Sequence, residues 1–391
     1  MGYDFTSLPD RRRSGAEKFH NMRQRCPHVP EDVIPFSVAD MDFLPPPALV
    51  EGLQAFIGNE IMGYTLPAES YYEAVLNWYS RRHGLSIPRE WLLDVDAVIP
   101  SMRHMIRTFS CPGDEVLLLV PVYMPFFSSI EELGRQVVSC ELILGADMRY
   151  TINFDRLEYL CRSSRAKILL FCNPHNPVGK IWSQTELEQV ADICLRHQVF
   201  IISDEIHWDL ILPGNHFVSM ASLPEKYLQN CAINTAATKT FNVAALRGAA
   251  TILPDEARRK QYLETDDASG PGILSYVACE LGYNRCEAWL DELLLVIQDN
   301  RDLLIEFMKQ RLPEVGVIPL EATYLQWLDF RALGMDAAEL EAFMAEKAFC
   351  FFTEGFKFGP GGAGFERWNL ACPRHVLLAG LERMEKAIRS R

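Results

Sequence analysis

The sequence predicts an α/β protein with a mainly parallel central sheet and a second, smaller α/β domain. Apolar runs of strand length recur through the first two thirds of the chain, and amphipathic helical segments lie between them. Buried strands that alternate with helices are typical of a parallel sheet covered on both faces. After about residue 270 the pattern changes to one long helix followed by shorter elements. The expected strands are 115–123, 137–144, 166–174, 199–206, 231–237 and 248–254.

The segments between and after these strands support the same fold. Residues 183–198 have a helical pattern that opens on Ser183 with Glu186 three residues later, which indicates a capping box. Residues 287–313 predict the long helix of the smaller domain. Residues 35–47 are rich in proline and aspartate and cannot form a regular helix, so we expect them to cross a surface or an interdomain groove.

Composition argues against several classes of function. The 391 residues carry a formal net charge of −14, whereas a nucleic-acid surface needs clustered Lys and Arg to neutralise phosphates. The sequence has no run of eighteen apolar residues and no secretory signal at its start, so we expect a cytoplasmic protein without membrane contact. Eleven scattered cysteines without a CxxC pair predict mostly buried reduced thiols, and neither a metal site nor a disulfide framework.

Polar residues follow three successive predicted strands. Asn176 lies in "NPHNPVG", Asp204 opens "DEIH" and Lys239 lies in "TKTF". Taken singly, these residues are typical of a turn, a helix cap and a surface cation. Ligands bind at the carboxyl ends of parallel strands, however, and all three are expected at that edge. Small and apolar neighbours surround Lys239, and an amine in such surroundings loses its proton more readily, as a nucleophilic or Schiff-base lysine requires.

Further motifs are distributed along the chain: "VADMDF", "GYT", "PGDEVLLLVPVYMPF", "CNPHNPVGKIW", "SDEIHWDL", "TKTFNVAALR", "TYLQWLDF" and "RWNLACPR". In their order and spacing they resemble those of pyridoxal-phosphate (PLP) enzymes of the aminotransferase fold, in the MalY/PatB-type branch of cystathionine β-lyase-like C–S lyases. The resemblance covers about residues 3–385. It implies the type I fold of PLP-dependent transferases, with an N-terminal segment (1–45) packing with the small domain, a large cofactor-binding domain (46–285) and a small C-terminal domain (286–391).

The resemblance assigns PLP as the cofactor and gives roles to residues around its ring. Lys239 would bind the cofactor as a Schiff base and move the proton at the substrate Cα. Asp204 would pair with the pyridine nitrogen, and Asn176 would hydrogen-bond the ring hydroxyl oxygen. His207 matches a position near that oxygen, and Tyr123 would stack on the ring face, although a buried core tyrosine is the plain alternative.

A second set of residues would hold the cofactor phosphate. Arg247 can offer a bidentate fork and Thr238 a hydroxyl. The backbone amides of Val98 and Ile99, at the start of a predicted helix, would complete the anion seat. Tyr64 would reach the phosphate from the other subunit, which implies a homodimer. With Lys239, the resemblance counts Tyr64 as catalytic.

The substrate implied by the resemblance is an α-amino acid. Arg367 would clamp its α-carboxylate, with Ala39 and Asn176 also contacting it. Arg374 is interpreted as a surface or structural arginine. Arg103 and His104 are unexpected in their helix, since relatives have small or apolar residues there; they either point outward or place a cation near the cofactor or substrate.

The favoured reaction is α,β-elimination from an S-substituted L-cysteine such as cystathionine, giving a thiol, pyruvate and ammonia. Transamination of an L-amino acid is the alternative, because it begins with the same proton removal by Lys239. Arg247 favours it, since the lyase branch commonly has glutamine there. A regulatory protein on this fold is a third interpretation. The intact set of Lys239, Asp204, Asn176 and Arg247 favours catalysis, because binding alone does not need the lysine.

Overall fold

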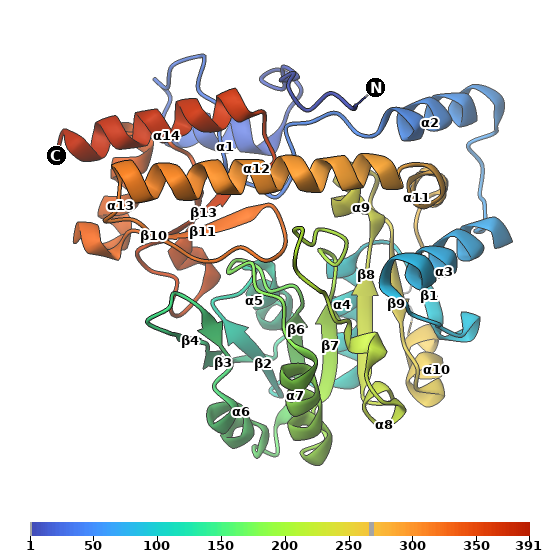
Figure 1. Cartoon of the computed structure of the whole chain (residues 1–391). Helices are drawn as coiled ribbons and strands as arrows, with labels where there is room; N and C mark the ends of the chain where they lie inside the picture. Colours follow the sequence, from blue (N-terminus) through green and yellow to red (C-terminus); the bar gives the residue numbers. More distant parts are fainter. Residues whose placement is uncertain (1, 266–269) are drawn as a thin grey trace.

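A seven-stranded central sheet forms the body of the molecule (Figure 1). The structure is a computed structural model that describes residues 2–265 and 270–391. The strand order is β1-β9-β8-β7-β6-β2-β3, and the pairs from β3 across to β8 are parallel. The predicted mainly parallel sheet is therefore confirmed. Its strands are β1 (Leu92–Val95), β2 (Glu115–Val120), β3 (Gln136–Glu141), β6 (Ala166–Cys172), β7 (Phe200–Asp204), β8 (Cys231–Thr235) and β9 (Ala249–Ile252).

Three details of the sheet differ from the sequence prediction. β9 runs antiparallel to β8, because the short connection between them does not return to the other end of the sheet. The strand expected over 137–144 ends at Glu141, and β4 (Ile143–Leu144) pairs instead with β5 (Tyr150–Thr151) in a separate hairpin. β1 was not predicted. It is a four-residue edge strand with a half-buried Asp94, so it lacks a continuous apolar run.

The central strands are apolar throughout because both of their faces are buried. In β2, Val116 and Leu118 join one hydrophobic cluster, while Leu117 and Leu119 join the other. Successive side chains of a strand point to opposite faces, so a two-sided sheet gives a continuous apolar run instead of an alternating one. This explains why the sequence pattern predicted the central strands well.

Helices cover both faces of the sheet. The capping box of Ser183 and Glu186 is present at the start of α7 (Gln184–Arg196), as predicted. The long helix expected over 287–313 is α12 (Glu287–Arg311). The other helices are α1 (Glu17–Arg25), α2 (Pro47–Asn59), α3 (Glu69–His83), α4 (Val98–Phe109), α5 (Pro125–Glu131), α6 (Phe154–Cys161), α8 (Glu225–Leu228), α9 (Ala237–Thr240), α10 (Glu256–Glu264), α11 (Ile273–Arg285), α13 (Ala337–Glu346) and α14 (Arg374–Arg389).

A second, four-stranded sheet follows α12 and contacts the N-terminal segment. Its order is β10 (Gly316–Val317), β11 (Leu325–Asp329), β13 (Phe365–Asn369), β12 (Thr353–Glu354). Phe36 donates its amide to the Phe351 carbonyl at 2.8 Å and accepts from the Asn369 amide at 3.0 Å. The proline-rich segment is irregular up to Pro47, as expected. The domain boundaries at residues 45 and 285 remain predictions.

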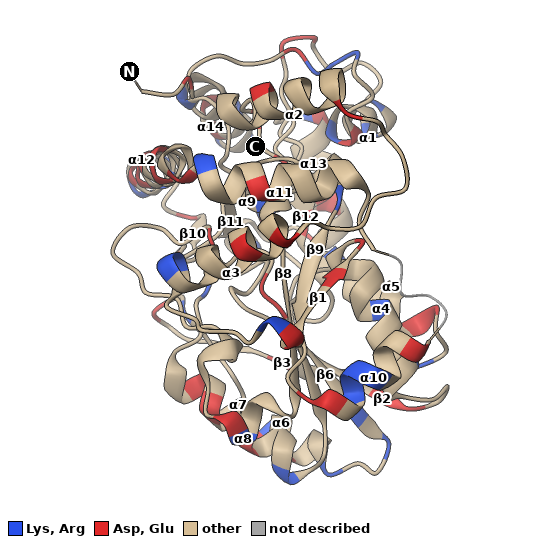
Figure 2. Ribbon diagram, turned by 90° about the vertical axis from the view of Figure 1, so that its right-hand side faces the viewer, with Lys and Arg blue, Asp and Glu red and all other residues tan. Residues whose placement is uncertain are grey.

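Acidic and basic residues are mixed along the chain, and most cysteines lie in the interior. Figure 2 shows basic ribbon segments scattered among acidic ones on that side of the molecule, without a continuous basic face. All eleven cysteines are free, and nine of them are buried, so the prediction of mostly buried thiols is confirmed. Within the described part of the chain, none of the helices combines the length and apolar character that a bilayer span needs.

The close approach of α11 to the turn that carries Lys239 gives a testable prediction. A Cβ added at Gly282 would lie 2.6 Å from the ring of the fully buried Phe241. We expect Gly282→Ala to lower the free energy of unfolding by about 1–3 kcal/mol, measured by denaturant titration. Gly58→Ala in α2, where an added Cβ meets nothing within 4 Å, is the matched control and should not destabilise. Equal stability of the two variants would contradict this packing.

Candidate active site

The ends of β6, β7 and β8 meet at one edge of the central sheet and line one cavity. Cys172, the last residue of β6, pairs with Asp204, which pairs in turn with Asn234 of β8. Just beyond these strand ends, Asn176 and Lys239 line a cavity of about 180 Å³ together with Asp204. The sequence prediction that these three residues share one edge is confirmed. We call this space the inner cavity.

Lys239 lies in the short helix α9 and points into the inner cavity. Its Nζ donates to the Ala39 carbonyl oxygen at 2.6 Å, and the Tyr324 hydroxyl donates to the same oxygen at 2.9 Å. Burial lowers the pKa of Lys239 to about 8, although the nearby Asp40 carboxylate acts in the opposite direction. A substantial fraction of the amine is therefore neutral near pH 8, and a neutral amine is nucleophilic.

Asp204 and His207 form the inner wall of the cavity, and both are nearly fully buried. Burial raises the pKa of Asp204 to about 6, while the Ile206 amide, which donates to its Oδ1 at 3.1 Å, lowers it. No Lys, Arg or His among the described residues forms an ion pair with Asp204. Burial lowers the pKa of His207 to about 3, helped by the charges of Lys239 and Arg367, so its imidazole is neutral.

Arg367 reaches the site from β13 of the second sheet. Its Nη1 donates to Asn176 Oδ1 at 2.9 Å, and its Nη2 donates to Thr353 Oγ1 at 3.2 Å. The guanidinium packs over the Phe358 ring at 5.0 Å, and its Nε is buried without a hydrogen-bond partner among the described residues. Burial lowers the pKa of Arg367 to about 10. A buried arginine held only by neutral groups has room for an anionic ligand.

The opposite end of the inner cavity collects donors suited to an anion. The first residues of α4, Val98 and Ile99, line it, and backbone amides at a helix start lack acceptors within the helix. Thr238 also lines the cavity. Arg247 lies at its edge and forms an ion pair with Asp96, which keeps the guanidinium near the helix start.

Tyr123 stands where the inner cavity opens into a larger one. It lines both spaces, and burial raises the pKa of its hydroxyl. The larger space, of about 750 Å³, is also lined by Ala39, Lys239 and Arg367. We call it the outer cavity. Any molecule that bridges Lys239 and Arg367 must extend into it.

Other residues singled out by sequence lie away from this cavity. Tyr64 is fully exposed in the loop between α2 and α3. On α4, Arg103 pairs with Glu132 at 2.7 Å, and the buried His104 bonds the Tyr262 carbonyl oxygen through Nε2 at 2.9 Å. The structure thus decides against a cation from either residue beside the inner cavity. Arg374 is exposed at the start of α14, as expected.

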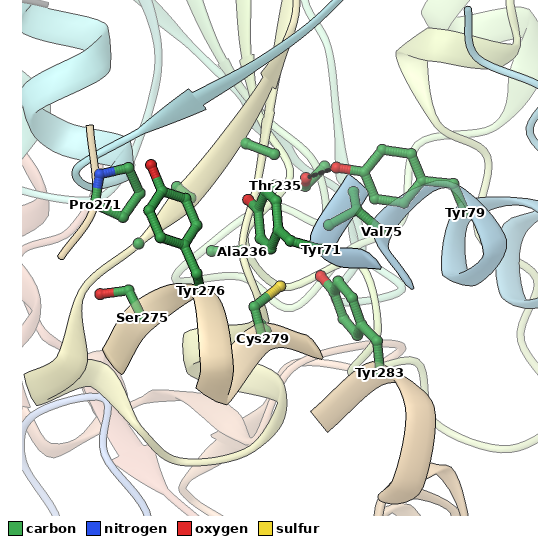
Figure 3. A pocket seen from close by; sticks show the side chains of 14 residues that line it. Tyr71, Val75, Tyr79, Thr235, Ala236, Pro271, Ser275, Tyr276, Cys279 and Tyr283 are labelled. Atoms are coloured by element: carbon green, nitrogen blue, oxygen red, sulfur yellow. Dashed lines mark hydrogen bonds between the residues drawn. The ribbon is translucent and has the colours of Figure 1, made fainter. Parts of the chain in front are cut away.

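A tyrosine-rich layer supports the turn that carries Lys239. Figure 3 shows Tyr71 and Tyr79 of α3 facing Tyr276 and Tyr283 of α11 around Thr235 and Ala236. The Tyr79 and Thr235 hydroxyls are 2.5 Å apart. The enclosed space is only about 10 Å³, which is enough for one water molecule and too small for a substrate. This layer therefore packs behind the turn that carries Lys239 and leaves no room for a ligand.

Two further residues at the site were missed by sequence reasoning. Tyr324 shares the Ala39 carbonyl with Lys239, and Asp96 holds Arg247. Tyr324 lies in the motif "TYLQWLDF", which contributed to the family resemblance, but its contact with Ala39 was not predicted. Nothing in the local sequence around Asp96 indicates that a residue 151 positions later would pair with it.

Comparison with known proteins identifies the family. A model of aminotransferases of class I and II matches residues 31–379. The chain belongs to this family. Within the class I and II aminotransferase family it is 36% identical to the cystathionine β-lyase PatB of Bacillus subtilis, over 91% of this chain and 93% of that protein. It is 31% identical to the protein MalY of Escherichia coli, over 99% of each. The resemblance to the MalY/PatB type is thus confirmed.

A solved structure extends the likeness to the whole fold. Cystalysin from Treponema denticola, whose crystal structure contains a pyridoxal 5'-phosphate cofactor, is 40% identical. It superposes with a TM-score of 0.97 over 100% of both chains. The type I fold expected for this member of the aminotransferase family is therefore confirmed.

The lowered pKa of Lys239 predicts a distinctive pH profile of chemical labelling. Reductive methylation with a small aldehyde requires the neutral amine, so its rate at Lys239 should be half-maximal near pH 8. An ordinary lysine has a pKa of about 10.4. Peptide mass spectrometry of the cofactor-free protein would measure the rate, with the exposed Lys260 of α10 in the same digest reporting the behaviour of the reagent. A Lys239 profile centred near the ordinary value would contradict the assignment.

Proposed function

We propose that this protein is a PLP-dependent carbon–sulfur lyase that eliminates a thiol from an S-substituted L-cysteine such as cystathionine. The observation that carries the proposal is the grouping of three poorly paired ionisable groups around the inner and outer cavities, which share Lys239 in their lining. These are the amine of Lys239, the buried carboxyl of Asp204 and the buried guanidinium of Arg367. The cytoplasmic location expected from the sequence is part of this proposal.

The side chains around the inner cavity fit PLP. Asp204 has no cationic partner in contact, and a protonated pyridine nitrogen would supply one. The start of α4, Thr238 and Arg247 offer donors and positive charge to a phosphate at the other end. Asn176 and His207 would face the ring hydroxyl oxygen, and Tyr123 would cover one ring face. Lys239 would bind the cofactor aldehyde.

When bound, PLP accepts the electron pair left on the substrate Cα after loss of its proton. Arg367 would hold the substrate α-carboxylate beside Asn176 and Ala39, which places Cα close to Lys239. Once the substrate amino group has taken its place on the cofactor aldehyde, the freed, neutral amine of Lys239 would take the proton from Cα. Because Ala39 accepts a hydrogen bond from Nζ, its carbonyl would orient the amine for this transfer. Asp204, ionised opposite a protonated ring nitrogen, would keep that nitrogen charged.

Elimination would then break the Cβ–S bond as the Cα electron pair forms a Cα–Cβ double bond, and the sulfur would leave as a thiol with the proton that Lys239 took from Cα. The remaining 2-aminoacrylate takes up water and gives pyruvate and ammonia, so the atoms balance. Similarity to cystathionine β-lyase PatB over nearly the whole chain supports elimination. Transamination would use the same Lys239 and Arg367, and no contact among the described residues favours it over elimination.

One assay tests the reaction. With L-cystathionine, the protein reconstituted with PLP should release thiol and pyruvate in equal amounts, measured by a thiol reagent and by lactate dehydrogenase. Lys239→Ala should lower the rate by at least about 1000-fold, because the general base is lost. Lys260→Ala, on the surface of α10, is the control. Transfer of the amino group to added 2-oxoglutarate, without thiol release from any cysteine conjugate, would overturn the lyase assignment.

We further propose that the active enzyme is a homodimer in which Tyr64 serves the neighbouring site. Tyr64 is fully exposed, and Ile61 and Leu66 beside it in the same loop are also largely exposed. Several exposed apolar side chains close together in one loop are typical of a protein interface. The phenol would reach the phosphate of the cofactor bound to the partner subunit.

Mixed dimers test this sharing of residues. Chains carrying Lys239→Ala and chains carrying Tyr64→Phe, each with its own affinity tag, are coexpressed and the doubly tagged dimer is purified. If Tyr64 serves the partner, one site receives both changes and the other receives neither. The mixed dimer should then be more active than either parent dimer. Activity no higher than that of the Tyr64→Phe parent, or an equally active monomer, would contradict the proposal.

A further inference from the structure

The outer cavity is much larger than a cysteine side chain requires. It measures about 750 Å³ and extends from Arg367 and Lys239 to the first helix, where Glu17, Asn21 and Gln24 line it. Under the proposed function, the α-carboxylate and Cα of the substrate occupy its inner end. The group attached to sulfur must then extend toward α1. The chemistry of that end decides which substituents are accepted.

Most charges around the outer cavity are already paired. Glu354 forms ion pairs with Arg25 and with Lys357, the latter at 2.7 Å. Asp40 forms ion pairs with Arg11 and with the fully buried Lys18, the latter at 3.0 Å. These groups have little net charge left for a ligand.

Besides Lys239, two charges that line the outer cavity lack an ionic partner among the described residues. Arg367, at the inner end, is bonded only to neutral groups. Glu17, at the outer end, receives only a long hydrogen bond from Asn21 Nδ2, at 3.5 Å. Burial is the main cause of the lowered pKa of Lys239, and the exposed Glu17 carboxylate is the weakest of the carboxylates that act in the opposite direction. The cavity thus has a cation at one end and an anion at the other.

We propose that Glu17 is a specificity-determining residue that selects cysteine conjugates whose S-substituent carries an ammonium group. This inference rests on the proposed function. A substrate with a carboxylate at its inner end and a second ammonium at its outer end matches the two unpaired charges of the cavity. Asn21 and Gln24 add amide oxygens that can accept from that ammonium. A neutral substituent has no charge to pair with Glu17, and an anionic substituent meets only cations that already pair with Glu354 among the described lining residues.

Glu17 also lies at a helix start, so its effect on the stability of α1 must be separated from its effect on the substrate by a matched control. It is the first residue of the nine-residue helix α1, where a carboxylate stabilises the helix dipole. Glu256 occupies the same position in α10, which also has nine residues, and it lies outside both cavities. Glu256→Gln therefore reports the effect of removing a carboxylate from a helix start without touching the site.

Cleavage of three conjugates tests the charge preference. The substrates are S-(2-aminoethyl)-L-cysteine, S-propyl-L-cysteine and S-carboxymethyl-L-cysteine. Glu17→Gln should lower kcat/KM for the aminoethyl compound by about three- to fivefold, leaving the propyl compound within about twofold. Glu17→Lys should reverse the preference in favour of the carboxymethyl compound. The preference of the unchanged enzyme should shrink at about 0.5 M salt, and Glu256→Gln should change none of these ratios.

Binding of sulfur-free analogues separates this inference from the proposed reaction. L-Lysine is the isostere of the aminoethyl conjugate, and L-norleucine carries no distal charge; calorimetry on the PLP-loaded dimer measures both. Weaker binding of lysine but not of norleucine to Glu17→Gln supports the role of Glu17, even if no conjugate is cleaved and the lyase assignment fails. Equal effects of Glu17→Gln on both ligands, or a Glu17→Lys variant without reversed preference, would overturn the inference.

Discussion

The free energy needed to bury the Lys239 amine is the constraint on which the site depends. An amine enclosed without a contacting carboxylate loses part of its hydration and becomes easier to deprotonate. The surrounding residues bury the Lys239 amine, but no carboxylate among the described residues forms an ion pair with it. The Ala39 carbonyl accepts its hydrogen bond, and Asp40 next to it is directed to Arg11 and Lys18 instead. Any rearrangement that turned Asp40 toward Lys239 would stabilise the charged amine and reduce its reactivity.

Arg367 is a second buried ionisable group without an ionic partner among the described residues, and it links the second sheet to the central one. Its hydrogen bond to Asn176 joins β13 to the segment that follows β6. Burial again makes the charge available, because the guanidinium has only amide and hydroxyl partners and a ring beneath it. Lys239 and Arg367 are thus two ionisable groups that contact only neutral protein partners, which leaves stronger interactions open to ligands.

Much of the fold could be predicted because the central strands are buried on both faces and leave a continuous apolar signal. Asn176, Asp204 and Lys239 could be grouped from the same reasoning, since they follow adjacent parallel strands. Arg367 entered only through family resemblance, because its neighbour in space is 191 residues away in sequence. The Ala39–Tyr324 bond and the direction of β9 depend on tertiary packing and leave no local pattern. His104 looked like a possible ligand-binding cation, and only the contact with Tyr262 shows its structural role.

The hydrogen bonds of the N-terminal segment bear on how the protein is made. Residues 36 and 42 bond to residues 351, 369 and 371, so the segment that presents Ala39 to Lys239 is fixed by the last portion of the chain. During synthesis the central sheet, complete by Ile252, leaves the ribosome long before these partners exist. The segment that presents Ala39 to Lys239 can therefore take up its final hydrogen bonds only after residue 371 has emerged, when the strands of the central sheet have long been synthesised.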